Sequence, residues 1–519
     1  MLQFEWILAL MIAAVALTAL SRTLKLPYPV LLALGGTALA LFPRTPAFTL
    51  NPELTLALFV APVLFNSAYD FSLRDLKSNW IPVTFLVVLA VGVTTAAVAY
   101  VTRTLIPDMP LAAAVALGAI VAPPDAAAAT TVLRQMNLPH RLMVILEGES
   151  LLNDASALLI YRLAISAAAA ESFNATDFGR ALALGVLASV GVGYVLAHSF
   201  VELISRVEDA PSATVLQFAA TFGVWLLADR LSLSPIITLV VFAFTAAQLA
   251  PQRMAARVRV SSYAVWQTAV FVLNVLAFVL VGLQLRPAVL SLAPSLRDRY
   301  LSVAGAVLAT VILVRLAWVA GYVGAARLKA HYLGTGSWPA NPVPSWAGAL
   351  VASWSGMRGV VTLAAAYALP LATKHSALFP YRNFILLCAF TVVVGTLVLH
   401  GLTLRPLLQL MNLRGDDTVR REVSLAQQEM NRAALVAIDG NGSAEAMALR
   451  RELSSGNQLV DGEGCTEPAA PRKLRAIIIE RQRTVLFKLR SEGMIGDDAF
   501  HDLEAQLDLA ELNMINELR

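Results

Sequence analysis

Ionisable and polar side chains cluster inside one long apolar stretch of the sequence. Residues 147–154 read Glu-Gly-Glu-Ser-Leu-Leu-Asn-Asp, whereas the surrounding residues 142–170 are mostly apolar. A charged side chain at the centre of a membrane-spanning helix costs about 2.5 to 3.5 kcal/mol on insertion scales, so charged residues at that depth usually serve ions or protons. The cluster therefore indicates ion or proton chemistry inside a membrane.

The spacing in this cluster decides which side chains share a helical face. Glu147, Ser150 and Asp154 follow one another at intervals of three and four residues, so on a helix they form one stripe. Glu149 and Asn153 form the adjacent stripe. Such oxygen-rich stripes suit a hard monovalent cation, and the Asp154 carboxylate can hold either a cation or a proton, but not both. Competition at one buried carboxylate is sufficient to couple the movements of the two ions without ATP.

The composition places this carboxylate in a membrane protein. Of the 519 residues, 58% are hydrophobic and 14% are charged, with a mean hydropathy of +0.68. Apolar runs of about 20 residues, the length that crosses a bilayer, recur up to residue 411. We therefore expect an all-α, polytopic fold of about 13 transmembrane helices, near residues 4–20, 28–43, 53–70, 80–102, 111–136, 141–170, 178–207, 212–230, 233–250, 260–286, 299–329, 344–372 and 382–411.

Two of the expected spans contain residues that interrupt a helix. The fifth includes 122–125 (Ala-Pro-Pro-Asp), and the twelfth includes 353–359 (Ser-Trp-Ser-Gly-Met-Arg-Gly). Because the breaks occupy matching positions, we expect two inverted six-helix repeats with two crossed discontinuous helices. Asp125 and Arg358 are placed to offset the partial charges of the half-helix ends.

The polar tail differs in composition from the rest of the chain. Residues 414–519 carry 14 Lys and Arg against 19 Asp and Glu. We expect a tail over 413–519, with a linker at about 437–471 and a helical hairpin at about 473–516. The hairpin either packs on itself or on the membrane domain, or it has a regulatory or ligand-sensing role. With the N-terminus outside, an odd number of spans puts this tail in the cytoplasm.

The interrupted and polar segments resemble motifs of a known family. Residues 148–154 (Gly-Glu-Ser-Leu-Leu-Asn-Asp) resemble the signature of the monovalent cation/proton antiporters, in the bacterial Na⁺/H⁺ exchanger branch with the Asn-Asp motif. Residues 122–125 and 356–360 are similar to the two broken-helix motifs of that family, in the same order. The resemblance covers roughly residues 1–411.

The resemblance implies roles for individual residues. Asp154 would bind the transported Na⁺ or the proton, with Asn153 as its polar neighbour and Ser150 as a further Na⁺ ligand. Glu149 would form a structural ion pair with Arg358. In the family, the Asn-Asp pair is associated with electroneutral exchange.

The resemblance also implies how the molecule is organised and where it departs from the family. A homodimer is expected, in which an ion-translocating core moves against a dimerisation domain. Asn66 stands where the family is often acidic, and Pro124 stands where the family commonly has Thr, so the details of ion coordination are expected to differ. The expected parts are dimerisation helices at about 4–70 and 212–286, and a core at about 80–170 and 299–411, within a membrane domain over 1–412.

Several of these side chains have more than one interpretation. Asp125 either compensates a half-helix terminus or binds the cation, and Glu147 is either a solvated carboxylate at the pathway's mouth or a group on the ion path, as Asn66 and Pro124 could also be. Arg315 is expected to be a structural cation that faces polar groups in the bundle. His140, in an expected loop, is expected to be solvated, with pH sensing as the alternative.

Three classes of function fit a buried carboxylate in a membrane. A secondary Na⁺/H⁺ antiporter accounts for the paired breaks; a K⁺/H⁺ antiporter and a cation channel are the alternatives. An intramembrane aspartyl protease would use Asp125 with Asp154, but leaves Asn153 and Arg358 unexplained. We therefore expect a transporter and no enzyme, with no cofactor beyond the transported Na⁺ (or Li⁺ or K⁺) and H⁺, no nucleic-acid partner, and a multi-pass location in the inner (plasma) membrane.

Overall fold

The computed structural model describes most of the chain. The described residues are 2–42, 52–125, 138–169, 175–284, 294–333, 345–370, 379–413, 415–439, 443–454 and 472–516, with the single positions Ala129, Leu133 and Met136. Within these ranges the regular structure is entirely helical. The all-α expectation is confirmed.

The first half of the membrane part contains long helices and short broken ones. In chain order these are α1 (Leu2–Leu24), α2 (Tyr28–Ala40), α3 (Pro52–Thr55), the π-helical η1 (Leu56–Val60), α4 (Ala61–Asp70), α5 (Leu73–Ser78), α6 (Trp80–Thr84), the π-helical η2 (Phe85–Ala90), α7 (Val91–Leu105), α8 (Leu111–Val121) and α10 (His140–Ala169). The segments from α3 to α4 and from α6 to α7 are each contiguous. Each of the two expected spans there, 53–70 and 80–102, is therefore one continuous helical rod.

The second half is built in the same way. It contains α11 (Ala175–Ile204), α12 (Ala210–Arg230), α13 (Pro235–Arg253), α14 (Ala256–Leu283), α16 (Pro294–Leu333), α17 (Trp346–Trp354), α18 (Val360–Tyr367) and α19 (Arg382–Met411). Several of these helices begin at a side-chain cap, as at Asp209, which accepts a hydrogen bond from the Ser212 N–H at 2.9 Å, followed by a proline in the first turn.

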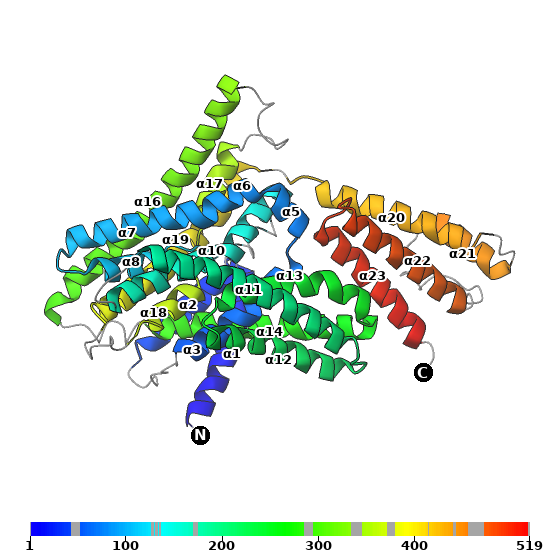
Figure 1. The fold of residues 1–519 in the computed structure, drawn as a ribbon, viewed down its shortest axis with the longest axis horizontal. Helices are drawn as coiled ribbons and strands as arrows, with labels where there is room; N and C mark the ends of the chain where they lie inside the picture. Colours follow the sequence, from blue (N-terminus) through cyan, green and yellow to red (C-terminus); the bar gives the residue numbers. More distant parts are fainter. Residues whose placement is uncertain are drawn as a thin grey trace.

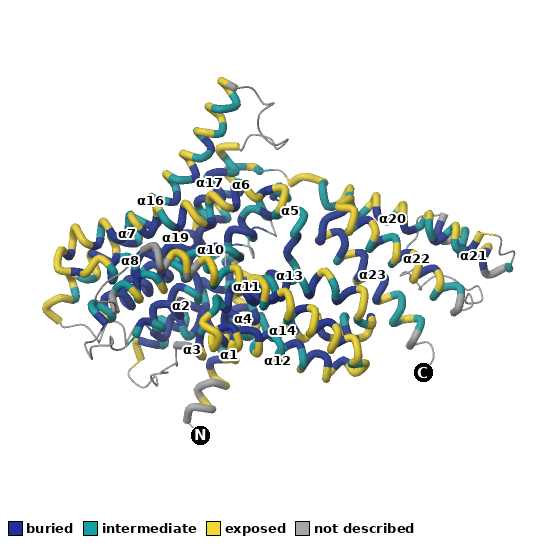
Figure 2. Tube along the Cα trace, in the orientation of Figure 1, coloured by how far each residue is buried: buried dark blue, intermediate teal, exposed yellow. Residues whose placement is uncertain are grey.

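The apolar helices have the lengths needed to cross a bilayer. Seven helical segments among the described residues are long and apolar enough, and four shorter apolar helices accompany them. Helix α10 has the length but falls outside this set, because Glu147, Glu149 and Asp154 interrupt its apolar character. Figure 2 shows the buried residues concentrated in the interior and the exposed ones on the outer faces.

The apolar interior of the membrane part forms two main clusters. One joins α2, α8, α14, α16 and α19, with residues such as Leu32, Leu117 and Phe384 fully buried. The other joins α4, α11, α12, α13 and the first half of α14 around Phe65, Phe242 and Trp266. Helix α10 contributes to both clusters, through Leu146 to the first and Leu151 to the second. The helix that carries the polar cluster therefore lies between the two apolar bodies.

The tail forms a helical unit at one end of the molecule (Figure 1). It contains α20 (Thr418–Ala437), α21 (Ala444–Ser454), α22 (Arg472–Ser491) and α23 (Asp497–Asn516). A small apolar core around Leu486, Phe500 and Leu503 joins α20, α22 and α23. The segment expected as a linker, 437–471, contains α21, and its residues 455–471 lie outside the described residues.

Candidate functional site

The two interrupted helices meet through their broken segments. Helix α8 ends at Val121 and α17 ends at Trp354, and the non-helical residues that follow each helix lie against one another. The Asp125 N–H donates a 2.7 Å hydrogen bond to the Met357 carbonyl. The backbone groups that the breaks set free are thus partly satisfied by the partner segment, as membrane depth requires. Residues 126–128 and 130–132, beyond the first break, lie outside the described residues.

Arg358 neutralises the carbonyl ends of the interrupted helices. Its guanidinium donates to the carbonyls of Val121 and Ala122, both at 3.3 Å, and to the carbonyl of Gly356. Arg358 is 1% exposed, so bulk solvent has almost no access to it. Because the C-terminal end of a helix carries partial negative charge, a buried cation there is favourable.

Asp125 lies at the opposite kind of helix end. Its carboxylate packs directly against Gly359, the residue that precedes α18, and a Cβ at position 359 would overlap the carboxylate. Partial positive charge accumulates at a helix N-terminus, so a carboxylate there is favourable. Only glycine leaves room for this approach.

Glu149 pairs with Arg315 and not with Arg358. Arg315 Nη1 lies 2.5 Å from Glu149 Oε1, and Nη2 lies 2.9 Å from Oε2, which makes a bidentate ion pair between α10 and α16. The expected ion pair between Glu149 and Arg358 is therefore wrong in its cation. Arg358 is committed to backbone carbonyls, and Arg315 reaches the carboxylate from the neighbouring helix.

Arg315 also binds the end of α17. Its Nε donates to the Ser353 carbonyl at 3.1 Å, and its Nη2 donates to the Ala352 carbonyl at 3.0 Å. The guanidinium packs against Gly356, where a Cβ would overlap it. The sequence held a signal for this role, because Arg315 is the only charged residue between 300 and 326, and an isolated buried cation needs a carboxylate partner.

Asn153 connects α10 to the first broken segment. Its Nδ2 donates a 2.6 Å hydrogen bond to the carbonyl of Pro124, and the side chain is fully buried. Its Oδ1 is also buried, and none of the described residues donates a hydrogen bond to it. A buried acceptor oxygen without a donor is costly unless something else satisfies it. The amide thus presents a free oxygen beside the break.

Asp154 is half-buried on the same helix, in the turn that carries Asn153. Its carboxylate lies within electrostatic range of the Asp125 carboxylate. The described residues place no hydrogen-bond donor and no cationic side chain on it. The structure therefore brings Asp154 within electrostatic range of Asp125, while Asn153 binds the carbonyl of Pro124, the residue before Asp125.

The remaining candidates are more peripheral. Ser150 and Glu147 are half-buried on α10, one and two turns before Asp154. Asn66, in α4, donates a 3.2 Å hydrogen bond from Nδ2 to Asp70 Oδ2, one turn further along its own helix. The amide of Asn66 thus serves its own helix, and within the described part of the chain it makes no hydrogen bond to the α10 cluster.

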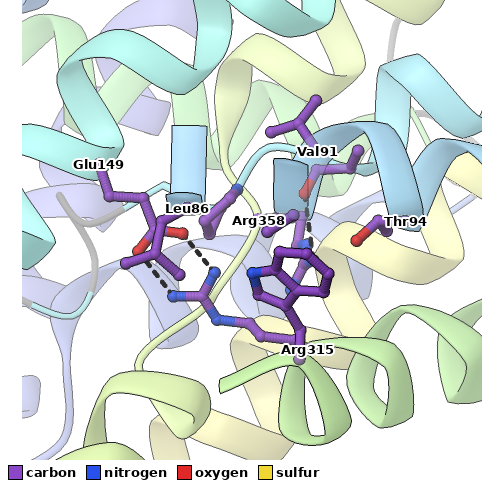
Figure 3. Close-up of a pocket in the computed structure, with 10 residues that line it drawn as sticks. Leu86, Val91, Thr94, Glu149, Arg315 and Arg358 are labelled. Atoms are coloured by element: carbon purple, nitrogen blue, oxygen red, sulfur yellow. Dashed lines mark hydrogen bonds and ion pairs between the residues drawn. The ribbon is translucent and has the colours of Figure 1, made fainter. Parts of the chain in front are cut away.

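A small pocket lies beside the Glu149–Arg315 pair (Figure 3). Figure 3 shows the Arg315 guanidinium turned toward the Glu149 carboxylate, with Arg358 behind it and Thr94 on the other wall. The lining residues are Leu86, Ala90, Val91, Thr94, Ala122, Pro124, Glu149, Arg315, Trp318 and Arg358. The pocket thus reaches both the ion pair and the first broken segment.

Comparison with known protein families matches the sequence of the membrane part to one of them. The family model described as "Sodium/hydrogen exchanger, transmembrane" matches residues 10–410. The chain belongs to the sodium/hydrogen exchanger family. Its members are transporters and not enzymes, and the match covers the whole membrane part, from within α1 to the end of α19.

Relatives of this exchanger cover nearly the whole chain, tail included. An uncharacterized Na⁺/H⁺ exchanger of Mycobacterium tuberculosis is 30% identical over 98% of this chain and 96% of its own length. A protein of Bacillus subtilis named "Sodium, potassium, lithium and rubidium/H(+) antiporter" is 27% identical over 95% of this chain and 75% of its own length.

A solved exchanger structure shares the fold. The sodium proton antiporter MjNhaP1 of Methanocaldococcus jannaschii superposes with a TM-score of 0.61 at 17% identity, over 79% of this chain and 97% of that one. The structural likeness supports the architecture of the membrane part.

Proposed function

We propose that this exchanger moves Na⁺ against H⁺ at Asp154, by secondary active antiport and without net charge transfer. Membership of the sodium/hydrogen exchanger family gives the class, monovalent cation/proton antiport. The observation that carries the site is the placement of Asp154 beside Asn153, whose Nδ2 binds the Pro124 carbonyl while its buried Oδ1 has no donor among the described residues.

The chemistry of competition follows from this placement. Na⁺ prefers oxygen ligands, and the Asp154 carboxylate, the Asn153 Oδ1 and the Ser150 hydroxyl offer them from one helix. A proton on Asp154 removes the negative charge that a cation needs. Binding of either ion therefore excludes the other, and one H⁺ replaces one Na⁺.

Electroneutral exchange follows from the single acid in the Asn-Asp pair. Asn153 is neutral, so the pair changes charge by one unit when Asp154 loses its proton, and one Na⁺ restores it. Asp125 is assigned to the N-terminus of α18, where its charge is offset by the helix end. In this assignment only Asp154 alternates between the two ions.

Alternating access requires one part of the membrane domain to move. We assign the motion to the core, residues 80–170 and 299–411, against dimerisation helices in 4–70 and 212–286 of a homodimer. Helices α2 and α14 of the dimerisation part share one apolar cluster with α8, α16 and α19 of the core, so the proposed movement slides the core, with Asp154 on α10, along this apolar interface. The protein is assigned to the inner membrane, with its tail in the cytoplasm.

At least one relative has a name that includes cations other than Na⁺. The Bacillus subtilis relative is named for sodium, potassium, lithium and rubidium. We propose Na⁺ as the substrate here and include Li⁺ and K⁺ as the ions to compare, because this chain departs from the family pattern at Asn66 and Pro124.

Exchange in liposomes tests the proposal directly. Purified protein is reconstituted with a pH-sensitive dye inside, and Na⁺, Li⁺ and K⁺ are added in turn, with and without an imposed voltage. We expect Na⁺-driven proton movement that is independent of voltage. Asp154→Asn abolishes it with normal protein yield, whereas Glu202→Gln, which changes an exposed carboxylate of α11, retains it. Exchange that persists in Asp154→Asn would remove Asp154 from its role.

A further inference from the structure

The tail is fastened to the membrane part at α14. Arg259 donates from Nε to Asp508 Oδ2 at 2.8 Å and pairs through Nη2 with Asp508 Oδ1. Glu504, one turn earlier on α23, lies 3.7 Å from Arg259 Nε. The Asp508 side chain is only 4% exposed and also accepts a 2.7 Å hydrogen bond from Arg483 of α22. This buried pairing anchors the hairpin on α14, which the proposed function places in the dimerisation domain.

A second contact joins the tail to α10. His140, the first residue of α10, has one nitrogen on each of two carboxylates: Nε2 lies 3.2 Å from Asp75 Oδ2 on α5, and Nδ1 lies 3.5 Å from Asp498 Oδ2 on α23. Helix α5 is itself held to α10, because Arg141 donates to Asn79 Oδ1 at 3.0 Å. His140 therefore links the tail to the helix that carries Asp154, and it is not the solvated loop residue expected from the sequence.

Neighbouring groups complete this contact. Arg74 pairs with Glu422 of α20 at 2.7 Å and donates to the Gly493 carbonyl at 3.2 Å. Glu422 in turn accepts a 2.6 Å hydrogen bond from the Gly496 N–H. The turn between α22 and α23 is thus seated on α5 beside His140. Figure 1 shows these tail helices next to α5 and α13.

The charges that face His140 come from every element around it. Asp75 and Asp498 are in contact, Asp416 from the segment before α20 lies within electrostatic range, and the cations nearby are Arg74 and Arg141. The hydrogen bond to Asp75 and these carboxylates raise the pKa of His140 above its ordinary value, against the opposing effect of partial burial. Burial would raise the pKa of Asp75, but His140 and Arg74 hold it below its usual value, so Asp75 stays ionised.

The two protonation states of His140 differ in what they can bridge. An imidazolium has two N–H donors and can bind Asp75 and Asp498 together. A neutral imidazole has one donor, so its other nitrogen presents a lone pair to a carboxylate. Loss of the proton therefore removes one of the two bonds and the attraction for both acids.

We propose that His140 is a second proton-binding site of this exchanger. Protonated His140 bridges Asp75 and Asp498 and so holds the turn between α22 and α23 on α10, while Arg259 holds α23 on α14. We call this bridge from His140 to Asp75 and Asp498 the clasp. With the clasp closed, the tail ties the helix that carries Asp154 to α14. The tail then resists movement of the core and slows exchange. The clasp is present below the raised pKa of His140 and is lost as the cytoplasmic pH rises through it. The effect on exchange rests on the proposed function; the clasp itself does not.

Hydrogen–deuterium exchange of the full-length protein tests the clasp without any transport. The amides of 493–498 are compared among wild type, His140→Gln and Asp498→Asn, at about pH 6 and about pH 8.5, on either side of the usual histidine range. At the acidic pH we expect both variants to exchange several-fold faster than wild type. At the alkaline pH wild type and His140→Gln exchange alike, and Asp498→Asn differs from them only by the intrinsic effect of the substituted side chain on neighbouring amides. Comparison at equal pH cancels the chemical dependence of amide exchange on pH.

Matched variants separate the clasp from general effects. Asp498 is 58% exposed in its side chain, so Asp498→Asn leaves folding intact. His331→Gln changes an exposed histidine of α16 and serves as the control, with wild-type exchange expected at both pH values. Equal protection of 493–498 in wild type and His140→Gln at the acidic pH would overturn the clasp.

Liposome exchange by the same proteins tests the consequence. When the pH on the tail side is changed from alkaline to acidic, the exchange rate of wild type should fall several-fold more than the rates of His140→Gln and Asp498→Asn. An identical pH profile in all three would overturn the restraint on the core even if the amide data stand. Failure of Asp154→Asn to abolish exchange would refute the proposed ion site and leave the amide result untouched, so the two failures are distinguishable.

Discussion

Glu149 and Arg315 form a buried bidentate ion pair that joins α10 to α16 beside the crossing of the broken helices. The side chains are 2% and 7% exposed, respectively. Burial of two charges costs several kcal/mol per ion, and the pair recovers this only through good geometry and further hydrogen bonds. Arg315 supplies those bonds by binding the Ser353 and Ala352 carbonyls at the end of α17. The pair therefore fixes where α17 stops.

Removal of one partner should destabilise the membrane part. Arg315→Met leaves the Glu149 carboxylate buried without a cation, and we expect a loss of about 3 to 5 kcal/mol. Thermal unfolding of the detergent-purified protein measures it. Glu149→Gln combined with Arg315→Met removes both charges and should recover part of the loss. A double variant no more stable than Arg315→Met would contradict a charge-based explanation.

Arg358 should matter more for folding than for ion choice. Its guanidinium binds three backbone carbonyls, so Arg358→Ala leaves buried acceptors without donors, at about 1 to 3 kcal/mol for each. We expect a several-fold drop in folded yield, measured by size-exclusion chromatography, while the protein that folds keeps the wild-type order of Na⁺, Li⁺ and K⁺. Normal yield with a changed ion order would assign Arg358 to the ion path.

The breaks in the two helices could be predicted from the sequence, but the identity of each charge's partner could not. Pro123, Pro124 and Gly359 each interrupt helical hydrogen bonding or allow close approach, so their effect is local and readable. Whether Glu149 meets Arg358 or Arg315 depends on the rotation of α10 against α16 and on how closely Arg315 approaches Gly356. These are relations between helices, and the order of residues along one helix does not contain them.

The tail shows the same limit. The spacing of Ile478, Leu486 and Leu489 predicts an amphipathic helix, and these residues are buried in the tail's own core. The polar face could not be assigned in the same way, because Asp508 and Asp498 resemble solvated acids in the sequence. Their partners, Arg259 and His140, are more than 200 residues away in the chain.

Close approach at Gly359 should be essential. A Cβ at this position overlaps the Asp125 carboxylate, so Gly359→Ala must displace either Asp125 or the start of α18. We expect Na⁺/H⁺ exchange in liposomes to fall at least tenfold, about 1.4 kcal/mol or more in the rate-limiting barrier. Gly305→Ala, on α16, is the control, since a Cβ there meets no atom within 4 Å. Equal rates in the two variants would show that the crossing tolerates a side chain.

Competition between Na⁺ and H⁺ should follow a single titration. If Asp154 alone alternates between the ions, each Na⁺ that binds displaces one H⁺. Below the working pH, the apparent KM for Na⁺ should therefore rise roughly tenfold for each unit by which the pH falls. Initial rates in liposomes, with equal pH on both sides and a range of Na⁺ concentrations, measure this slope. His140→Gln serves as the background, because it removes the proposed second proton site and leaves the α10 carboxylates in place. A slope near two would mean that Asp125, within electrostatic range of Asp154, also gives up a proton when Na⁺ binds, and would refute electroneutral exchange through one acid.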